Sequence, residues 1–346
     1  RLMMAANTED FVIVGAQNSE ANEHISKPAL SFWQDAWRRL KLNKLAVISL
    51  WFLIFILAFA VLSNIFVPQK NANAFNSDKV GVYKNLPPNS GLPIPGWNGK
   101  IKAPGDTTAT NVYESQGVPE NKKFILGTDN IGRSVAKRVT VGLRISLLVA
   151  IVATLIDLFV GVAYGVFSGW KGGWIDNVMQ RIIEILSSIP NLIIVTMLGL
   201  LLGGGVLSII LAIAMTGWLG MARQVRNMTL TLKERDYVLA AKSLGESSFK
   251  IAIKHLIPNM AGTIIVQIMM TVPSAIMFEA VLSAINLGVK PPTASLGSLI
   301  SDAQAMLQFY PYQILIPSAV LVLVSLAFIL LGDGLRDAFD PRASED

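Results

Sequence analysis

The stretch from Leu45 to Val67 reads LAVISLWFLIFILAFAVLSNIFV and carries no charged side chain. A helix needs about 20 mostly apolar residues to cross the roughly 30 Å of bilayer hydrocarbon, because it rises about 1.5 Å per residue. In lipid the backbone must satisfy its own hydrogen bonds. The stretch therefore predicts a transmembrane helix and places the chain among membrane proteins.

Five further segments have the apolar composition and roughly the length of a span. Each carries at most one charged residue, and the segments are Ile145–Trp170, Ile182–Leu202, Val206–Ala222, Met260–Leu287 and Ile314–Gly332. Together with the first segment they predict an all-α polytopic membrane protein with six transmembrane helices.

The overall composition excludes several classes of function for this chain. Charged residues make up 15% of the chain, against roughly 25% in soluble domains. There is no cysteine, which excludes disulfides, thiolate metal sites and a cysteine nucleophile. Neither a phosphate-binding glycine loop nor a Gly-x-Ser-x-Gly turn occurs. We therefore expect no catalytic site, cofactor or metal on this chain, and we ascribe its net charge of +6 to basic cytoplasmic loops rather than to nucleic-acid binding.

Lysine and arginine residues predict the orientation, because cytoplasmic loops are enriched in them. The loop between the fourth and fifth apolar segments is strongly basic, whereas the next loop holds only Lys290. A further basic cluster precedes the first segment, within the amphipathic stretch Ser31–Lys44, which we expect to lie in the membrane interface. Both termini are thus predicted to be cytoplasmic, as tails covering residues 1–44 and 338–346.

Residues 68–144 form a long connection on the predicted extracytoplasmic side. Its first part is rich in proline and glycine, which favours extended and turn-rich structure over helix. This insertion is either a disordered outer loop or a small external element that contacts a delivery protein or the mouth of a pore. Composition alone leaves both alternatives open.

Three acidic residues fall within the predicted spans, where a charge is costly and indicates a function. Asp157 could serve a proton or cation relay, or it could hydrogen-bond a neighbouring helix. Glu184 can reach Arg181 three residues earlier, so we expect an ion pair. Glu279 could shape a pore or brace neighbouring helices.

The cytoplasmic loop over residues 223–259 is too long for a simple connector. A helix-like stretch over 233–244 carries a small apolar patch of Tyr237, Ala240, Ala241 and Leu244. Gly245 follows and suits a left-handed turn that ends a helix. We expect this loop to bind a cytoplasmic partner, and the alternative is a pair of interfacial helices resting on anionic lipid.

The same loop resembles a known motif. Asp236-Tyr-Val-Leu-Ala-Ala-Lys-Ser-Leu-Gly245, followed by His255-Leu-Ile-Pro258-Asn259, is similar to the "EAA" motif of ABC importer permeases. Leu239 stands where that motif has an acid, and His255 and Ile257 replace its usual aliphatic pair. Further matches are Gly127–Arg133, Gly142–Ser146, Gly288–Gly297 and Leu331–Asp337, with Ser134 in place of an aspartate and Leu296 in place of a tryptophan.

These matches resemble the C-type permease subunit of the dipeptide, oligopeptide and nickel importer family. The resemblance implies a type I permease core over residues 145–337 in a bacterial cytoplasmic membrane. It implies a second permease subunit as heterodimer partner, two cytoplasmic ATPase subunits that bind ATP and Mg²⁺, and an extracytoplasmic peptide-binding protein. It also implies coupling to the ATPase through Asp236, Tyr237, Ala240, Ala241, Leu244, Gly245, His255 and Pro258.

Three alternatives remain at this stage. The same architecture could import nickel or another small solute. An ion-coupled secondary transporter would act alone and would need Asp157. A membrane scaffold would bind partners and transport nothing.

Overall fold

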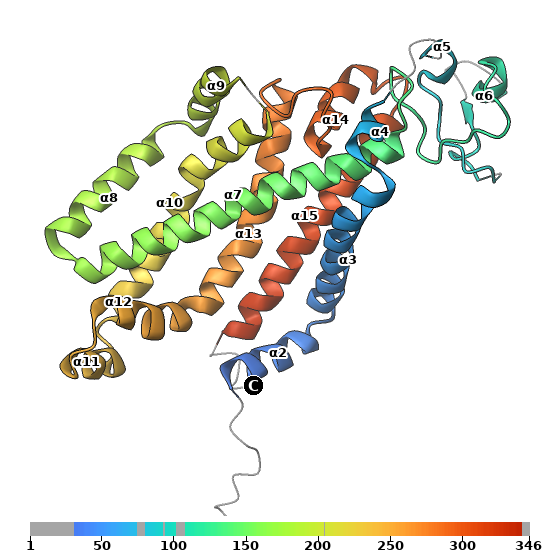
Figure 1. Cartoon of the computed structure of the whole chain (residues 1–346). Coiled ribbons are helices and arrows are strands. Elements are labelled where there is room, and N and C mark those ends of the chain that lie inside the picture. Colours follow the sequence, from blue (N-terminus) through green and yellow to red (C-terminus); the bar gives the residue numbers. More distant parts are fainter. Residues whose placement is uncertain (1–30, 75–79, 93, 102–107, 204, 341–346) are drawn as a thin grey trace, which may run out of the picture.

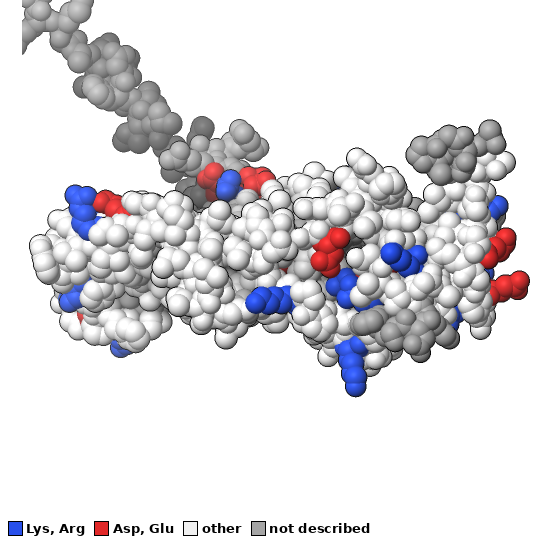
Figure 2. Space-filling model, turned by 90° about the horizontal axis from the view of Figure 1, so that it is seen from above, with Lys and Arg blue, Asp and Glu red and all other residues white. Residues whose placement is uncertain are grey.

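The computed structural model describes residues 31–74, 80–92, 94–101, 108–203 and 205–340. This part of the chain is almost entirely helical, with one small antiparallel pair of strands, β1 (Lys100–Ile101) and β2 (Thr110–Asn111). Figure 2 shows the molecule from above, and uncharged side chains cover most of the surface seen there. The outer parts of both predicted tails, 1–30 and 341–346, lie outside the described residues.

Within the described ranges, five helical runs are long and apolar enough to cross a membrane. They are α3 (Lys44–Phe66), α7 (Val135–Lys171), α10 (Val206–Leu232), the continuous run Ser248–Ala284, and α15 (Tyr312–Phe339). The fourth run joins α12 (Ser248–Ile251), the π-helical turn η3 (Ala252–Leu256) and α13 (Ile257–Ala284). Figure 1 shows these helices side by side, with the short helix α2 (Phe32–Leu42) at one end.

The segment Ile182–Leu202, which the sequence predicts as one helical span, is not a continuous helix. α8 (Gly173–Ser188) ends before Ile189, α9 (Asn191–Leu202) starts after Pro190, and the two helices are bent by 80°. The reason is local, since proline lacks an N–H, clashes with the preceding turn and disfavours helical geometry in the residue before it. The pair is a broken span or a re-entrant loop.

Two helices extend far beyond the predicted spans. α7 starts at Val135 rather than near Ile145, and α10 continues to Leu232 rather than ending near Ala222. The hydropathy pattern identifies only the section of each helix that is apolar enough to lie in the hydrocarbon layer. The helical hydrogen bonds continue beyond that section through charged residues. With 37 residues, α7 is about 55 Å long.

α7 and α10 are packed closely through a row of glycines on α7. Gly161, Gly165 and Gly169 recur every four residues and therefore share one face of the helix. A Cβ atom added to Gly165 would lie 2.6 Å from the carbonyl oxygen of Ala222 and 2.8 Å from the Cβ of Val225. Small residues of this kind allow two transmembrane helices to approach closely.

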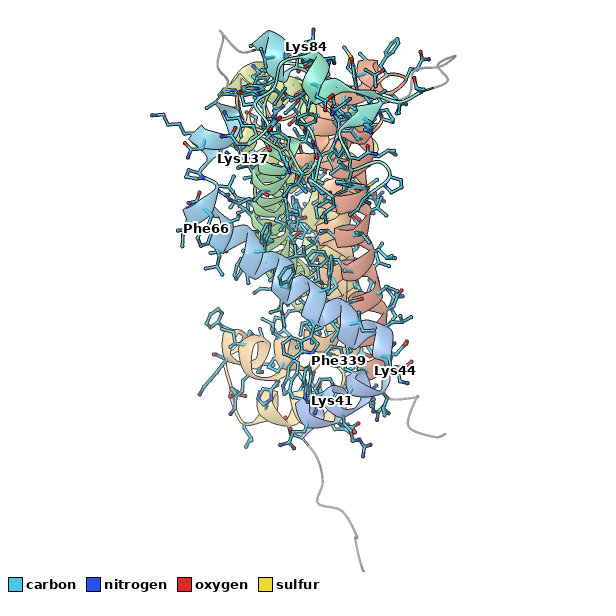
Figure 3. The ribbon with its side chains drawn as sticks, turned by 90° about the vertical axis from the view of Figure 1, so that its right-hand side faces the viewer. Lys41, Lys44, Phe66, Lys84, Lys137 and Phe339 are labelled. Atoms are coloured by element: carbon cyan, nitrogen blue, oxygen red, sulfur yellow. The ribbon has the colours of Figure 1, made fainter. Side chains whose placement is uncertain are left out.

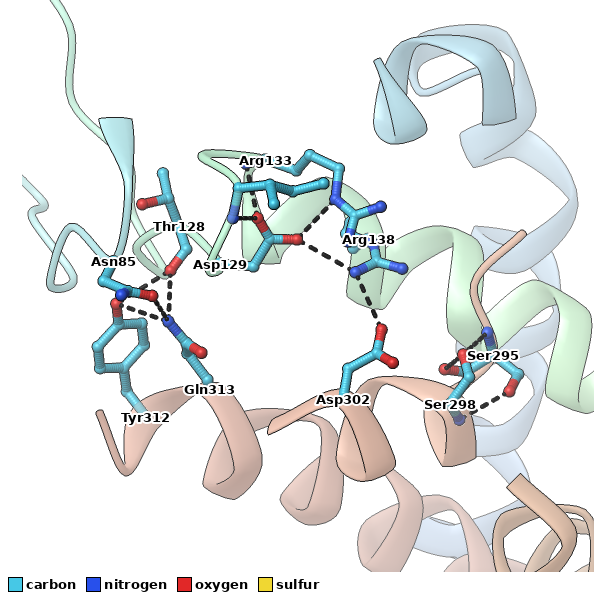
Figure 4. Close-up of polar contacts among 11 residues, drawn as sticks. Asn85, Thr128, Asp129, Arg133, Arg138, Ser295, Ser298, Asp302, Tyr312 and Gln313 are labelled. Atoms are coloured by element: carbon cyan, nitrogen blue, oxygen red, sulfur yellow. Dashed lines mark hydrogen bonds and ion pairs between the residues drawn. The ribbon is translucent and has the colours of Figure 1, made fainter. Parts of the chain in front are cut away.

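The insertion before α7 is an ordered small element in its described parts, which include α4 (Gln69–Asn73), α5 (Val80–Tyr83) and α6 (Val112–Ser115). The first residues of α15 hold it. The Tyr312 hydroxyl donates to the Leu86 carbonyl oxygen at 2.8 Å. The Gln313 amide donates to Asn85 and to the Thr128 carbonyl oxygen, both at 2.9 Å (Figure 4). The alternative of a disordered outer loop is therefore wrong for these parts.

A second contact ties the insertion to the connection between α13 and α15. This connection contains α14 (Leu296–Ala303) and the 3₁₀ turn η4 (Gln304–Met306). Arg138, near the start of α7, is buried between Asp129 of the insertion and Asp302 of α14, at 3.1 and 3.5 Å (Figure 4).

We predict that Gly165→Leu separates α7 from α10 and destabilises the protein by about 1–3 kcal/mol or more, because overpacking a tight contact costs this much. The measurement is the thermal unfolding of the purified chain in detergent. Gly220→Leu on α10 is the matched control, since a Cβ atom at Gly220 meets nothing within 4 Å. Equal unfolding temperatures for the two variants would contradict the role of the glycine row.

Candidate functional site

A conspicuous segment between α10 and α13 consists of residues 236–251, here called the docking segment. It contains α11 (Asp236–Ser243), a turn and α12, and α10 ends only a few residues before it. Figure 1 shows it at the end of the molecule opposite the insertion. Asp236 is the first residue of α11, where an acid suits the helix dipole.

The predicted apolar patch is divided by the fold. Tyr237, Ala240 and Leu244 are exposed, and 88% of the Leu244 surface is accessible. Ala241 is buried with Val238 in a cluster of this chain's own hydrophobic residues. The exposed patch therefore has three residues, and Ala241 serves to hold α11 against the rest of the chain.

Gly245 ends α11 as expected. Its φ of +79° is in the left-handed region, where glycine has no steric penalty. The N–H of Gly245 donates to the Lys242 carbonyl oxygen, and the N–H of Glu246 donates to that of Ala241, both at 3.1 Å. This pair of hydrogen bonds is a Schellman motif, which fixes the direction of the chain after the helix.

His255 and Glu246 close the segment across this turn. The His255 Nε2 lies 2.9 Å from a Glu246 carboxylate oxygen, and Lys254 lies 3.8 Å from the other. The hydrogen bond from His255, with Lys254 nearby, lowers the pKa of Glu246. His255 lies in η3, and Pro258 follows in the first turn of α13, where proline is tolerated. The predicted site residues did not include Glu246. Its position, an acid directly after the glycine that ends the helix, was a feature of the sequence that could have identified it.

Two of the three intramembrane acids have partners. Arg181 and Glu184 form the expected ion pair at 2.6 Å on the exposed face of α8. Glu279 is fully buried and accepts hydrogen bonds from the hydroxyls of Ser146 (3.0 Å), Ser283 (2.8 Å) and Ser295 (2.6 Å). Since these serines lie on α7, on α13 and before α14, Glu279 braces three elements.

Asp157 differs from the other two acids. Both of its carboxylate oxygens are buried and have no hydrogen-bond partner within the described part of the chain. They lie against Gly217 of α10, where an added Cβ atom would approach an oxygen within 2.1 Å. No group of three histidine, cysteine, aspartate or glutamate residues suited to a metal ion gathers among the described residues.

Comparisons with known proteins identify the family. A family model for the binding-protein-dependent transport system inner membrane component matches residues 161–345, more than half of the chain. A second model, for the N-terminal TM domain of oligopeptide transport permease C, matches residues 31–88.

The curated relatives agree with these models. The dipeptide transport system permease protein DppC of Lactococcus lactis subsp. cremoris is 62% identical over 338 residues, which cover 98% of each chain. DppC of Bacillus subtilis is 39% identical over 96% of this chain and 93% of its own. The oligopeptide transport system permease protein OppC of Escherichia coli K12 is 36% identical over 96% of this chain and 99% of its own. The chain therefore belongs to the family of inner membrane components of binding-protein-dependent transport systems, which are the permease subunits of ABC importers.

Proposed function

We propose that this chain is one of the two permease subunits of an ATP-driven peptide importer and forms half of its translocation path. The observation that carries the proposal is the 62% identity to a dipeptide permease over nearly the full length of both chains. The remaining partners are a second permease subunit, two cytoplasmic ATPase subunits that bind ATP and Mg²⁺, and an extracytoplasmic peptide-binding protein. The chain itself hydrolyses no ATP.

The proposed topology has six spans, with the bent pair of α8 and α9 as the third. An even number of crossings requires both described ends of the chain to lie on one side of the membrane. The contacts between these ends support this. Phe32 of α2 stacks on Phe339 of α15 with ring centroids 5.6 Å apart, and Arg39 donates to the Asp340 carbonyl oxygen at 2.9 Å. Figure 3 shows Lys41, Lys44 and Phe339 at one end of the molecule and Lys84 and Lys137 towards the other.

The docking segment lies on the proposed cytoplasmic side and is the proposed contact with an ATPase subunit. Its exposed patch of Tyr237, Ala240 and Leu244 combines a small residue, which permits close approach, with two large apolar side chains. Exposed apolar residues on a rigid, capped helix are typical of a protein interface. The buried residues of the segment, Val238 and Ala241, attach it to the rest of the chain through a hydrophobic cluster.

We predict that Ala240→Asp lowers peptide uptake by at least about tenfold while the chain stays in the membrane. A carboxylate buried without a partner in an interface costs several kcal/mol, and about 1.4 kcal/mol already corresponds to tenfold. The measurement is uptake of a labelled peptide by cells that express the importer.

Leu239→Glu is the matched control on the same helix, because the family motif has an acid at that position. We expect it to retain uptake. Normal uptake with Ala240→Asp would contradict the docking assignment.

The cargo is tested with the assembled importer in vesicles. We expect peptide loaded on the binding protein to stimulate ATP hydrolysis and to accumulate inside, and Ni²⁺ to do neither. Stimulation by Ni²⁺ alone would support the alternative of a metal importer.

The ion-coupled alternative makes Asp157 indispensable. We predict that Asp157→Asn retains most of the ATP-dependent uptake, since the carboxylate lies against Gly217 of this chain's own α10 and the amide has nearly the same size. Uptake is measured with and without an imposed proton gradient. If Asp157→Asn abolished uptake, and uptake no longer depended on the proton gradient, the result would favour the secondary transporter.

A further inference from the structure

One face of α3 is apolar and is left uncovered by the rest of the described chain. Ile48, Trp51 and Phe55 follow Lys44 at intervals of four, three and four residues, so all four side chains share one face of the helix. The three apolar side chains are between 63% and 65% exposed. α3 is also the least buried of the five long helices, with 22% of its most apolar stretch buried. We call the row of Ile48, Trp51 and Phe55 the α3 stripe.

The opposite face of α3 fixes the direction of the α3 stripe. Ala46, Ser49 and Leu53 lie on that opposite face and are buried. The packing on α15 is tight there, because a Cβ atom added to Gly334 of α15 would clash with the Cβ of Ala46. The α3 stripe therefore points away from the bundle.

Two lysines lie at the end of the α3 stripe near α2. Lys44 is the first residue of α3, Lys41 is in the last turn of α2, and both are exposed (Figure 3). Asp35, the one acid in the sequence of α2, is paired with Arg38 at 3.1 Å and with Arg39 at 2.7 Å. Within the described part of the chain no carboxylate forms an ion pair with either lysine, so two positive charges remain without a counter-ion.

Trp37 adds an aromatic ring to this end. The Lys41 ammonium lies 5.4 Å from the centroid of the half-exposed Trp37 ring, within the range of a cation–π contact. On the other side of α2, Ala36 and Leu40 are buried, which fixes the helix on the bundle. Tryptophan beside lysine on an amphipathic helix is typical of the boundary between hydrocarbon and lipid headgroups.

The length of the α3 stripe matches one leaflet of a bilayer. Lys44 and Phe55 are eleven positions apart, which corresponds to about 16 Å along the helix. Half of the roughly 30 Å of hydrocarbon is about 15 Å. An acyl chain that lies along the α3 stripe and ends near Phe55 therefore has its headgroup level with Lys44 and Lys41.

We propose that Lys41 and Lys44, together with Trp37, form a headgroup site for an anionic phospholipid whose acyl chain lies along the α3 stripe. The negative charges of the headgroup meet two unpaired ammonium groups, and the acyl chain covers the three apolar side chains. A zwitterionic lipid fits the α3 stripe equally well but brings its own cation to the lysines, so the site prefers an anionic lipid.

A helix of another subunit is a poorer occupant of this face, because it would have to supply carboxylates for both lysines or leave their charges uncompensated. The inference rests on the proposed topology only for the name of the leaflet, which is then the cytoplasmic one.

The experiment places a fluorescent reporter beside the site. The chain has no cysteine, so a fluorophore can be attached at Leu45→Cys, an exposed position next to Lys44. The assembled importer is placed in bilayers of phosphatidylcholine and phosphatidylglycerol, in which one lipid or the other carries bromine on its acyl chains and quenches the reporter. We expect phosphatidylglycerol to be preferred at least about fivefold in relative affinity, because each lysine near an anionic lipid strengthens binding by about that factor.

Substitutions of the lysines test the site itself. We expect Lys41→Gln and Lys44→Gln each to lower the preference for phosphatidylglycerol several-fold, and the double variant to abolish it. Arg38→Gln is the matched control, because it removes the same charge from an exposed position on α2 whose guanidinium is already paired with Asp35. We expect Arg38→Gln to retain the preference.

Three results would overturn the proposal. Equal quenching by the two lipids would show that the site does not select anionic lipid, and an equal loss of preference in Arg38→Gln would show a diffuse effect of charge. No quenching by either lipid in the assembled importer would show that another subunit covers the α3 stripe. Peptide uptake enters none of these measurements, so they are independent of the proposed cargo.

Discussion

The close contact between α7 and α10 organises the helix bundle. Lipid offers no hydrophobic drive between two apolar helices, so their association relies on packing and on buried polar contacts. The glycines on α7 let the backbone of α10 approach within contact distance of that of α7. A polar cluster of Ser168 on α7, Asp176 on α8 and Arg226 on α10 then closes the contact at one end.

Buried polar groups elsewhere in the bundle follow the same logic. In an apolar medium an acid is tolerated when donors surround it. Glu279 meets this condition through three serine hydroxyls, and two of these hydroxyls also accept backbone N–H groups at the start of α14. Glu279 therefore positions the connection between α13 and α15. Asp157 has no such donors among the described residues, and it lies where the packing of α7 on α10 is tightest.

The docking segment shows how a short helix becomes a rigid surface. α11 has only eight residues and would not be stable alone. Its inner face is buried, its end is fixed by Gly245, and His255 and Glu246 join the turn to the π-helical stretch. Each feature reduces the conformational freedom of the exposed patch.

Composition and short-range spacing predicted the helical membrane class, the short helix that ends at the left-handed Gly245, and the ion pair of Arg181 with Glu184. These features depend on local composition and on spacings within a few residues. The folded structure was needed to find that Ala241 faces inward, that α8 and α9 are bent by 80° near Pro190, and that Arg226 contacts Asp176, fifty positions earlier in the chain. The physical reason is that a periodic pattern identifies an apolar face but not which neighbour covers it, and the partner of a buried charge is set by how distant helices pack.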